Sequence, residues 1–290
     1  MQLVLCAAWK RGEFMTFKQV LKYPGSKWGM AWIVKHFPEH HTYVSPYFGS
    51  GADFFLKRPA GYEVINDRSG SVVNLFQVIR EHGQDLAELI ELTPWSRDEY
   101  YASYEKTGDA IEDARRFLVR CWQAHGTRMN TRTGWRNRGS ANGGQTTSLW
   151  RQLPDRIIAV IDRLKDTEIE NKPALELIGR FQDQTDCLIY ADPPYPLETR
   201  NYRKMYEHEM NDEDHVALLK ALIQHRGPVV LSSYPNSLYE EILQGWQCVT
   251  MPTVAEAGAM RTEVLWLNRK AAHRRDAHTE RLPLFCEVQI

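Results

Sequence analysis

Short apolar runs alternate with helix-like segments along two stretches of this chain, and this rhythm constrains its fold more than any other feature. The runs are rich in β-branched or aromatic residues and end at positions suited to a turn into a helix. Strands are expected over 42–48, 62–67, 168–170, 187–191, 228–233, 247–251 and 262–268, and helices over 173–181, 212–225 and 236–243. The pattern predicts an α/β sheet with helices on both faces.

The rhythm is interrupted between about residues 70 and 165. Helical patterns cover 69–92, 109–125 and 148–165, whereas 127–147 is dense in Gly, Asn, Thr and Arg and is expected to form a long loop or irregular hairpin. We therefore expect a catalytic domain made of 15–69 and 166–270 and a mostly helical insertion at 70–165. Residues 1–14 lack clean periodicity and are expected to be dispensable, and 271–290 to form a charged tail.

Composition indicates an ordinary globular protein in which 43% of 290 residues are hydrophobic. No run reaches the roughly 18 apolar residues of a membrane helix, and the opening segment lacks a signal-peptide pattern, so a cytoplasmic location is expected. The five cysteines are scattered without a C-x-x-C pair, which predicts reduced thiols. His36, His40 and His41 lack further ligands, so no metal site is expected.

Positive charge is concentrated in one region although the whole chain has a net charge of −1. Between Ala114 and Pro154 the sequence contains no Asp or Glu. The same stretch contains eight arginines, at positions 115, 116, 120, 128, 132, 136, 138 and 151. This distribution predicts a cationic surface suited to a nucleic acid.

A glycine-containing turn, Phe48-Gly49-Ser50-Gly51, follows the first expected strand. Glycines at such a turn let a ligand approach the backbone, although the pattern is equally typical of a plain turn. Asp67 ends the next strand, where a carboxylate can accept hydrogen bonds from ribose hydroxyls or cap the following helix. The two features together favour an adenosine-containing ligand.

The tetrapeptide Asp192-Pro193-Pro194-Tyr195 directly follows the apolar strand 187–191. An exocyclic amine on a planar ring is a poor nucleophile unless its lone pair is freed from the ring. Asp192 can accept one N–H of such an amine, and the carbonyl of Pro193 can accept the other. Tyr195 offers a flat face on which a base swung out of a duplex can stack. The arrangement favours direct attack by the amine, without a covalent intermediate.

Together with a third segment, Lys22-Tyr23-Pro24-Gly25-Ser26-Lys27, these motifs resemble the Dam-type family of adenine-N6 DNA methyltransferases in the motif order called α. The resemblance spans about residues 20–268. It implies a class I S-adenosylmethionine-dependent methyltransferase fold, Rossmann-like with a mixed seven-stranded sheet. This chain has Ser45 where the family usually carries Asp or Glu, and Tyr47 where it carries Phe, a departure that bears on cofactor affinity and not on the family.

The resemblance also implies roles for individual residues. Methyl transfer to N6 of adenine is assigned to Asp192, Pro193, Pro194 and Tyr195. S-adenosylmethionine is expected to contact Lys22, Tyr23, Lys27, Pro46, Phe48, Gly49, Ser50, Gly51, Asp67 and Asp192. Double-stranded DNA is the expected partner, and phosphate and base contacts are expected from Arg120, Arg128, Asn130, Arg132, Arg136, Asn137 and Arg138. The protein is expected to be a monomer that associates with the nucleoid through DNA.

Two other interpretations stay open. One assigns the substrate amine to N4 of cytosine or to glutamine, but those families more often show Ser or Asn in place of Asp192. The other makes the chain a DNA-binding regulator that has kept the fold and lost turnover. Separately, the segment Arg281 to Phe285 resembles the Q-L-x-L-F motif that grips the bacterial sliding clamp, so a clamp contact through Leu282 to Phe285 is a further expectation.

Overall fold

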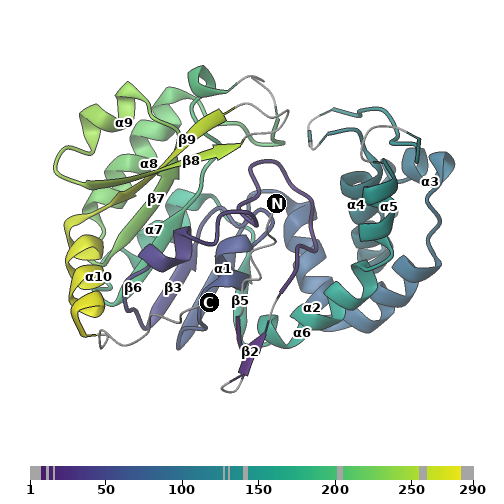
Figure 1. The fold of residues 1–290 in the computed structure, drawn as a ribbon, viewed down its shortest axis with the longest axis horizontal. Helices are drawn as coiled ribbons and strands as arrows, with labels where there is room; N and C mark the ends of the chain where they lie inside the picture. Colours follow the sequence, from purple (N-terminus) through teal and green to yellow (C-terminus); the bar gives the residue numbers. More distant parts are fainter. Residues whose placement is uncertain are drawn as a thin grey trace, which may run out of the picture.

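The computed structural model describes residues 8–10, 13–15, 17–126, 128–129, 131–139, 143–200, 205–254 and 260–281. Its centre is a seven-stranded sheet with the order β5-β4-β3-β6-β7-β9-β8 (Figure 1). The strands are β3 (Thr42–Ser45), β4 (Tyr62–Asn66), β5 (Thr167–Glu170), β6 (Cys187–Ala191), β7 (Val229–Ser233), β8 (Gln247–Val254) and β9 (Met260–Leu267). Only β9 runs against its neighbours β7 and β8. The expected mixed seven-stranded α/β sheet is confirmed.

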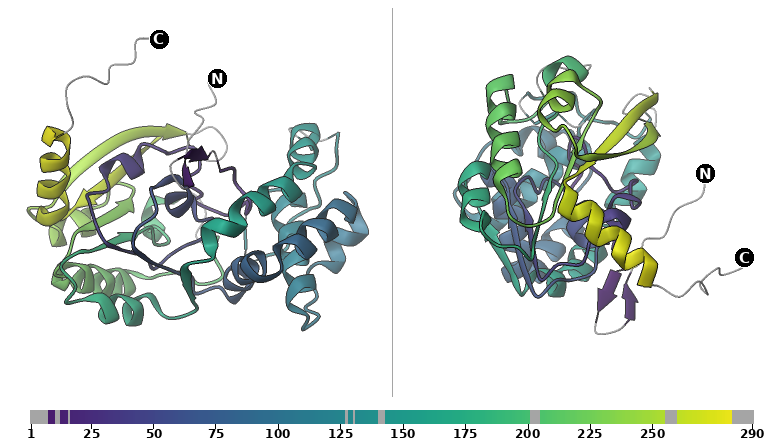
Figure 2. Two further views of the ribbon diagram at one scale, coloured as in Figure 1. Left: turned by 90° about the horizontal axis from the view of Figure 1, so that it is seen from below. Right: turned by 90° about the vertical axis from the view of Figure 1, so that its left-hand side faces the viewer.

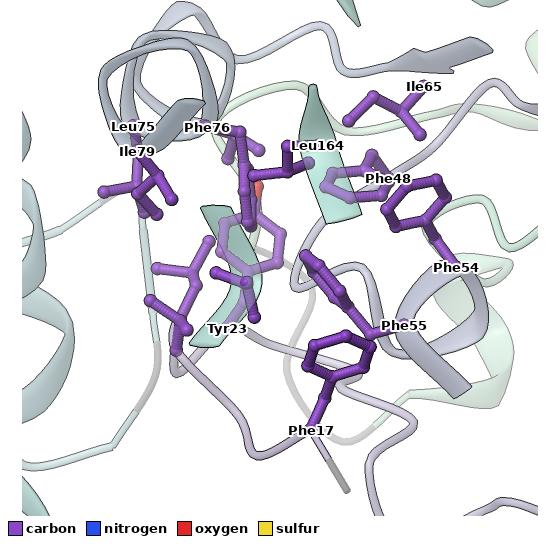
Figure 3. Close-up of a cluster of buried hydrophobic side chains, with 14 of the residues drawn as sticks. Phe17, Tyr23, Phe48, Phe54, Phe55, Ile65, Leu75, Phe76, Ile79 and Leu164 are labelled. Carbon is purple, nitrogen blue, oxygen red and sulfur yellow. The ribbon is translucent and has the colours of Figure 1, made fainter. Parts of the chain in front are cut away.

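Alternating side chains along the strands build two cores, one on each face of the sheet. Val44 of β3 packs with residues of α7 (Ala174–Phe181), α8 (Asp212–Gln224) and α9 (Ser237–Ile242). Its neighbour Tyr43 points to the opposite core, which includes α1 (Ala52–Leu56), α2 (Gly70–Leu92) and α6 (Leu153–Leu164). Figure 3 shows the aromatic centre of this second core, where the Phe48 and Phe76 ring centroids lie 4.8 Å apart.

The helices between β4 and β5 extend away from the sheet (Figure 1). They are α2, α3 (Arg97–Ala102), α4 (Ala110–Gln123), α5 (Gly143–Trp150) and α6. Helix α2 has a non-helical residue at His82, and buried side chains from both of its halves belong to the same core. A Cβ at Gly83 would lie 2.7 Å from Ile161 of α6, so glycine permits the close approach of these two helices. The division at residues 70 and 165 into two domains stays a prediction.

A buried ionic cluster ties α6 to the sheet. Glu63 of β4 pairs with Lys57, which follows α1, and with Arg163 of α6. The Arg163 guanidinium also lies 3.6 Å from the centroid of the Phe54 ring. Because all three charged groups are buried, loss of one partner would leave an uncompensated charge, which is strongly destabilising.

Several expected boundaries are wrong in detail. The first strand stops at Ser45 because Pro46 lacks an N–H for the ladder. The single helix expected over 148–165 is two helices, α5 and α6, because Pro154 stands in the first turn of α6 and cannot continue the preceding helix. Helix α5 also begins at Gly143, inside the expected loop 127–147.

The two ends of the described chain contain more structure than the sequence indicated. Residues Ala8–Lys10 (β1) and Glu13–Met15 (β2) pair as an antiparallel hairpin separate from the large sheet, within the extension expected to be dispensable. Helix α10 (Arg269–Arg281) occupies part of the expected charged tail and packs beside β7 and β9 (Figure 2). Its buried Ala271 anchors an otherwise polar helix. Among the described residues, no helix is long and apolar enough to cross a membrane.

Candidate active site

A cavity of about 350 Å³ opens at the carboxyl ends of β3, β4 and β6. The order β4-β3-β6 makes this the point where successive parallel strands are added in opposite directions, and ligands of open α/β sheets bind at such points. We refer to this cavity as the cleft. Its walls come from segments 23–27, 46–53, 67–69, 173–175, 192–194 and 206–210.

The glycine turn forms one wall of the cleft. Gly49 and Gly51 have φ values of 50° and 68°, a region that side-chain-bearing residues rarely adopt, and a Cβ at Gly51 would overlap the Phe48 ring. The Gly49 N–H donates to Asp67 Oδ2 at 2.8 Å, and the Ser69 N–H donates to Asp67 Oδ1 at 2.8 Å. One carboxylate thus holds both the glycine turn and Ser69, the residue that caps α2, beside the cleft. Hydrogen bonding of Asp67 to a ribose stays a prediction.

Asp192 stands at the cleft beside a buried ammonium group. Lys27 Nζ lies 3.2 Å from Asp192 Oδ1 and 3.4 Å from Glu263 Oε1, and it donates to the Tyr195 hydroxyl oxygen at 2.7 Å. The Tyr195 hydroxyl donates in turn to Glu263 Oε1. Residues separated by up to 236 positions therefore share one hydrogen-bonded cluster, which includes Glu263 of β9, a residue that the sequence motifs did not indicate.

Burial governs the ionisation of this cluster. Burial raises the pKa of Asp192, and the Lys27 ammonium opposes that rise. Burial also raises the pKa of Glu263, again opposed by Lys27 and reinforced by Asp192. Burial alone would lower the pKa of Lys27, but Asp192 and Glu263 raise it above its ordinary value. Lys27 is therefore an ammonium ion at neutral pH.

The cleft is acidic overall. Its lining includes Lys27 and Arg68 as permanent cations but six carboxylates, from Asp53, Asp67, Asp192, Glu207, Glu209 and Asp214. Burial raises the pKa values of Asp53 and Asp67 to about 6 each. Asp53 lies in the first turn of α1 and accepts a hydrogen bond from the Tyr43 hydroxyl. The excess of carboxylates suits a ligand with a positive charge.

The segment 205–210, which sequence reasoning missed, contributes residues 206–210 to another wall of the cleft. Glu209 Oε1 accepts from the N–H groups of Met205 and Tyr206, while its Oε2 accepts from Arg200 at 2.6 Å. The Tyr206 ring lies 6.1 Å from that of Tyr23, and its hydroxyl is 2.6 Å from the place of a Cβ at Gly25. The Met129 N–H donates to the Met205 carbonyl at 2.9 Å, which joins this wall directly to the loop after α4.

Most of the residues predicted to bind the cofactor line the cleft. Four of the residues predicted for catalysis or cofactor binding do not. Tyr23, Lys27, Pro46, Phe48, Gly49, Ser50, Asp67, Asp192 and Pro194 line the cleft. Gly51 and Pro193 are buried next to lining residues, and Lys22 is half-buried. Tyr195 is only 8% exposed and faces Tyr234, with ring centroids 4.7 Å apart. Pro173, Ala174 and Leu175 also line the cleft and carried no sequence signal.

The described residues among those predicted to contact DNA lie on α4 and in the segment that follows it. Arg128, Arg132, Asn137 and Arg138 are exposed, whereas Arg120 and Arg136 are half-buried. The Arg136 Nε donates to the Ala124 carbonyl, and the Arg132 guanidinium lies 5.1 Å from the Tyr101 ring centroid. Asn130 lies outside the described residues, as do Leu282 to Phe285.

Two arginines of the cationic stretch are held by acids from outside it. Arg115 pairs with Glu99 at 2.8 Å and with Glu112 at 2.7 Å, and Arg116 pairs with Glu112 at 2.7 Å. Arg97 of α3, which precedes the stretch, instead adds an exposed guanidinium that lies 5.1 Å from the Trp135 ring centroid. Two of the eight arginines counted along the sequence are therefore paired with acids, whereas Arg97, outside that count, adds exposed positive charge.

Comparison with known proteins identifies a family for most of the chain. Residues 23–258 match a family model described as D12 class N6 adenine-specific DNA methyltransferase. Among solved structures, the chain is similar to a precorrin-8w decarboxylase from Methanobacterium thermoautotrophicum, with a TM-score of 0.34 and 7% sequence identity over 87% of this chain and 96% of the other. The range matched by the family model contains both the glycine turn and Asp192 to Tyr195.

Proposed function

Because the chain belongs to the family of D12 class N6 adenine-specific DNA methyltransferases, we propose that it transfers a methyl group from S-adenosylmethionine to N6 of adenine in double-stranded DNA. The observation that carries this proposal is the position of Asp192. Its carboxylate stands at the cleft, where Lys27 pairs with Oδ1, and in this proposal Oδ2 accepts from a substrate amine. The neighbouring prolines hold the backbone of this segment in a restricted conformation.

The residues at the cleft edge would activate the adenine amine by hydrogen bonding. Asp192 accepts one N–H and the Pro193 carbonyl accepts the other, so the nitrogen lone pair is drawn out of conjugation with the ring. Tyr195 borders the space that an everted base would enter, with Tyr234 at its side. The amine attacks directly, and catalysis rests on positioning and on the negative charge near the nitrogen that becomes positive.

The cleft has the properties that S-adenosylmethionine requires. The glycine turn allows close approach to the backbone, and Asp67 can accept hydrogen bonds from ribose hydroxyls. When bound, the cofactor supplies an electrophilic methyl group on a positively charged sulfur. The acidic lining favours such a cation. Asp53 lies close to Ser45, whose hydroxyl lowers the pKa of the Asp53 carboxyl group. Asp53 thus supplies a carboxylate in place of the acid that the family usually carries at position 45.

The exposed arginines would hold the duplex so that the target base reaches the cleft. In this proposal, phosphate contacts from Arg128, Arg132 and Arg138 fix the position of the duplex, and the exposed Asn137 reads a base edge. Arg97 and Trp135 extend this surface onto α3. Within this proposal, residues 70–165 act as the target-recognition insertion of a monomeric enzyme. The contact with a sliding clamp through Leu282 to Phe285 is proposed from the sequence alone.

Transfer of isotope-labelled methyl groups tests the proposal. The protein is incubated with labelled S-adenosylmethionine and unmethylated double-stranded DNA, and the modified nucleoside is identified by mass spectrometry. Label in N6-methyladenine supports the proposal. Label in N4-methylcytosine would assign a different amine, and DNA binding without any label would instead favour a regulator.

A further inference from the structure

Glu263 is a buried acid that the roles proposed above leave unused. It is fully buried at the inner end of β9, where the following residues, Val264 to Leu267, form the apolar part of the strand. One carboxylate oxygen, Oε1, accepts from the Tyr195 hydroxyl and lies 3.4 Å from Lys27 Nζ. The other oxygen, Oε2, is buried without a hydrogen-bond partner. A buried carboxylate with one unpartnered oxygen is costly, which indicates a role other than stability.

The cluster around Lys27 contains two carboxyl groups and one ammonium group. The three N–H groups of Lys27 face Asp192 Oδ1, the Tyr195 hydroxyl and Glu263 Oε1, at 3.2, 2.7 and 3.4 Å. Two carboxylates thus share one ammonium group. If Glu263 were absent, Lys27 would pair with Asp192 alone and neutralise it, which would make Asp192 a weaker acceptor for a substrate N–H.

We infer that Glu263 is a positioning residue for methyl transfer, which shares Lys27 and fixes the Tyr195 hydroxyl so that Asp192 keeps a net negative charge toward the adenine amine. The inference rests on the proposed function and deepens it. Glu263 does not line the cleft, so it acts through Lys27 and Tyr195 and not by contact with a ligand. Its effect should therefore appear in the rate of transfer and not in the affinity for DNA.

Other groups around the cluster must be considered in any pH measurement. Besides Lys27 and Tyr195, several groups interact electrostatically with Asp192 or Glu263. They are Asp53, Tyr190, Tyr206, Tyr234 and Tyr239, and Arg261 lies beside Tyr234. The tyrosines have pKa values raised by burial and stay neutral at acidic pH. Asp53, with a pKa of about 6, ionises in the acidic range. The informative quantity is therefore the difference between wild type and a Glu263 variant.

Glu263→Gln removes the charge and keeps an oxygen acceptor for Tyr195. We expect kcat to fall about tenfold or more while the KM for DNA stays within about threefold, since the lost interaction serves the transition state. Loss of a nearby negative charge also favours ionisation of Asp192, so the acidic limb of the kcat profile should move to lower pH. Glu240→Gln, the same change at an exposed residue of α9, should alter neither quantity.

The experiment measures kcat, KM and the pH profile for wild type, Glu263→Gln, Glu263→Asp and Glu240→Gln, after thermal denaturation has shown which variants fold. Glu263→Asp keeps the carboxylate on a shorter side chain, so we expect a lowered kcat and an unchanged acidic limb of the pH profile. This variant also tests the inference if Glu263→Gln does not fold. Wild-type kcat in Glu263→Asp, or an unchanged kcat and limb in Glu263→Gln, would overturn the inference. An inactive wild type would instead refute the proposed function.

Discussion

Carboxylates of the cleft and of the helical region 70–165 occupy opposite electrostatic environments. Burial raises the pKa values of Asp53 and Asp67 to about 6, whereas hydrogen bonds from Arg115 and Arg116 lower the pKa of Glu112 to about 2. An acid with a raised pKa costs stability when ionised, and one with a lowered pKa contributes stability. Ionised Asp53 and Asp67 therefore make the folded protein less stable, as expected of residues that serve a function. In the helical region, ion pairs of α3 and α4 make it more stable.

One acid of the cleft departs from this contrast in an informative way. Burial would raise the pKa of Glu209, but hydrogen bonds from Arg200 and from the N–H groups of Tyr206 and Met205 lower it. Glu209 holds the segment 205–210 together and so resembles Glu112 in its role. The direction of the pKa shift therefore separates two kinds of acid. Acids with raised pKa values are those proposed to interact with a ligand, and acids with lowered pKa values already have partners within the protein.

The largest effect is expected for Asp192→Ala. Loss of the acceptor for the substrate amine should lower methyl transfer on the order of 10³-fold, by analogy with other electrostatic groups aimed at a transition state. DNA binding should stay within about threefold, because a carboxylate at the cleft contributes no phosphate contact in this scheme. Single-turnover transfer and a DNA-binding titration measure the two quantities. Asp183→Ala, at an exposed acid after α7, is the control, and retained activity in Asp192→Ala would refute the assigned role.

Asp67→Asn should weaken cofactor binding. A hydrogen bond to a charged group contributes about 1.5–3 kcal/mol, so the Kd for S-adenosylmethionine should rise roughly tenfold to a hundredfold. The effect should also appear in wild type as pH falls, because the acceptor is lost when Asp67 is protonated near pH 6. Isothermal titration calorimetry at pH 8 and pH 5 measures both. Equal Kd values for variant and wild type at pH 8 would exclude Asp67 from the binding site.

Asp53→Asn and Glu112→Gln should change stability in opposite directions. The cost of ionised Asp53 is absent below its unfolded pKa of about 3.9 and complete above about 6, so Asp53→Asn should stabilise the protein by about 2 kcal/mol at pH 8. The benefit of Glu112 is present above its unfolded pKa of about 4.3 and is lost as pH falls toward 2. Because Glu112 is partly exposed, Glu112→Gln should cost only about 1 kcal/mol at pH 7.

Denaturant unfolding at pH 8, 7 and 4 measures these differences, and both should shrink at the lowest pH. Asp53→Asn should at the same time weaken cofactor binding, which would mark Asp53 as a functional acid. A destabilised Asp53→Asn protein with unchanged cofactor affinity would show that Asp53 belongs with the structural acids.

The smallest effect is expected on the basic surface, where single exposed charges are screened by salt. Arg132→Ala should weaken DNA binding about threefold and reduce the slope of log K against log salt by roughly one, as for the loss of a phosphate contact. Arg116→Ala is the matched control, since Arg116 is held by Glu112 and by two carbonyls. It should lower stability and leave the salt slope unchanged. Equal slopes for both variants would remove Arg132 from the DNA surface.

Elements with a strong local pattern were predictable from the sequence. The strand Cys187–Ala191 has the expected bounds, since a short apolar run before two prolines leaves little choice of ending. The neighbourhood of Gly49, Asp67 and Asp192 followed from topology, because turns after neighbouring parallel strands meet at one edge of the sheet. Helix α10 escaped prediction because, among its residues with described burial, two small alanines, Ala271 and Ala272, mark its core-facing side.

Contacts distant in sequence were not predictable from motifs. Glu263 meets Lys27 only because β9 is inserted antiparallel between β7 and β8, a pairing that no local pattern encodes. One signal was available: Glu263 is in phase with Leu265 and Leu267, which point to the core, so a charged side chain occupies an inward position of a strand. The pairing of Arg115 and Arg116 with Glu99 and Glu112 was hidden because those acids lie outside the charge window.

The hydrogen bond from the Met129 N–H to the Met205 carbonyl gives one wall of the cleft a mechanical connection to the region that we propose grips the duplex. Under the proposed function, a duplex that displaces the loop carrying Met129 would act through this bond on the segment beside Tyr23 and Gly25. Any change that the duplex makes in the dissociation constant of the cofactor by this route would, by thermodynamic reciprocity, equal the change that the cofactor makes in that of the duplex.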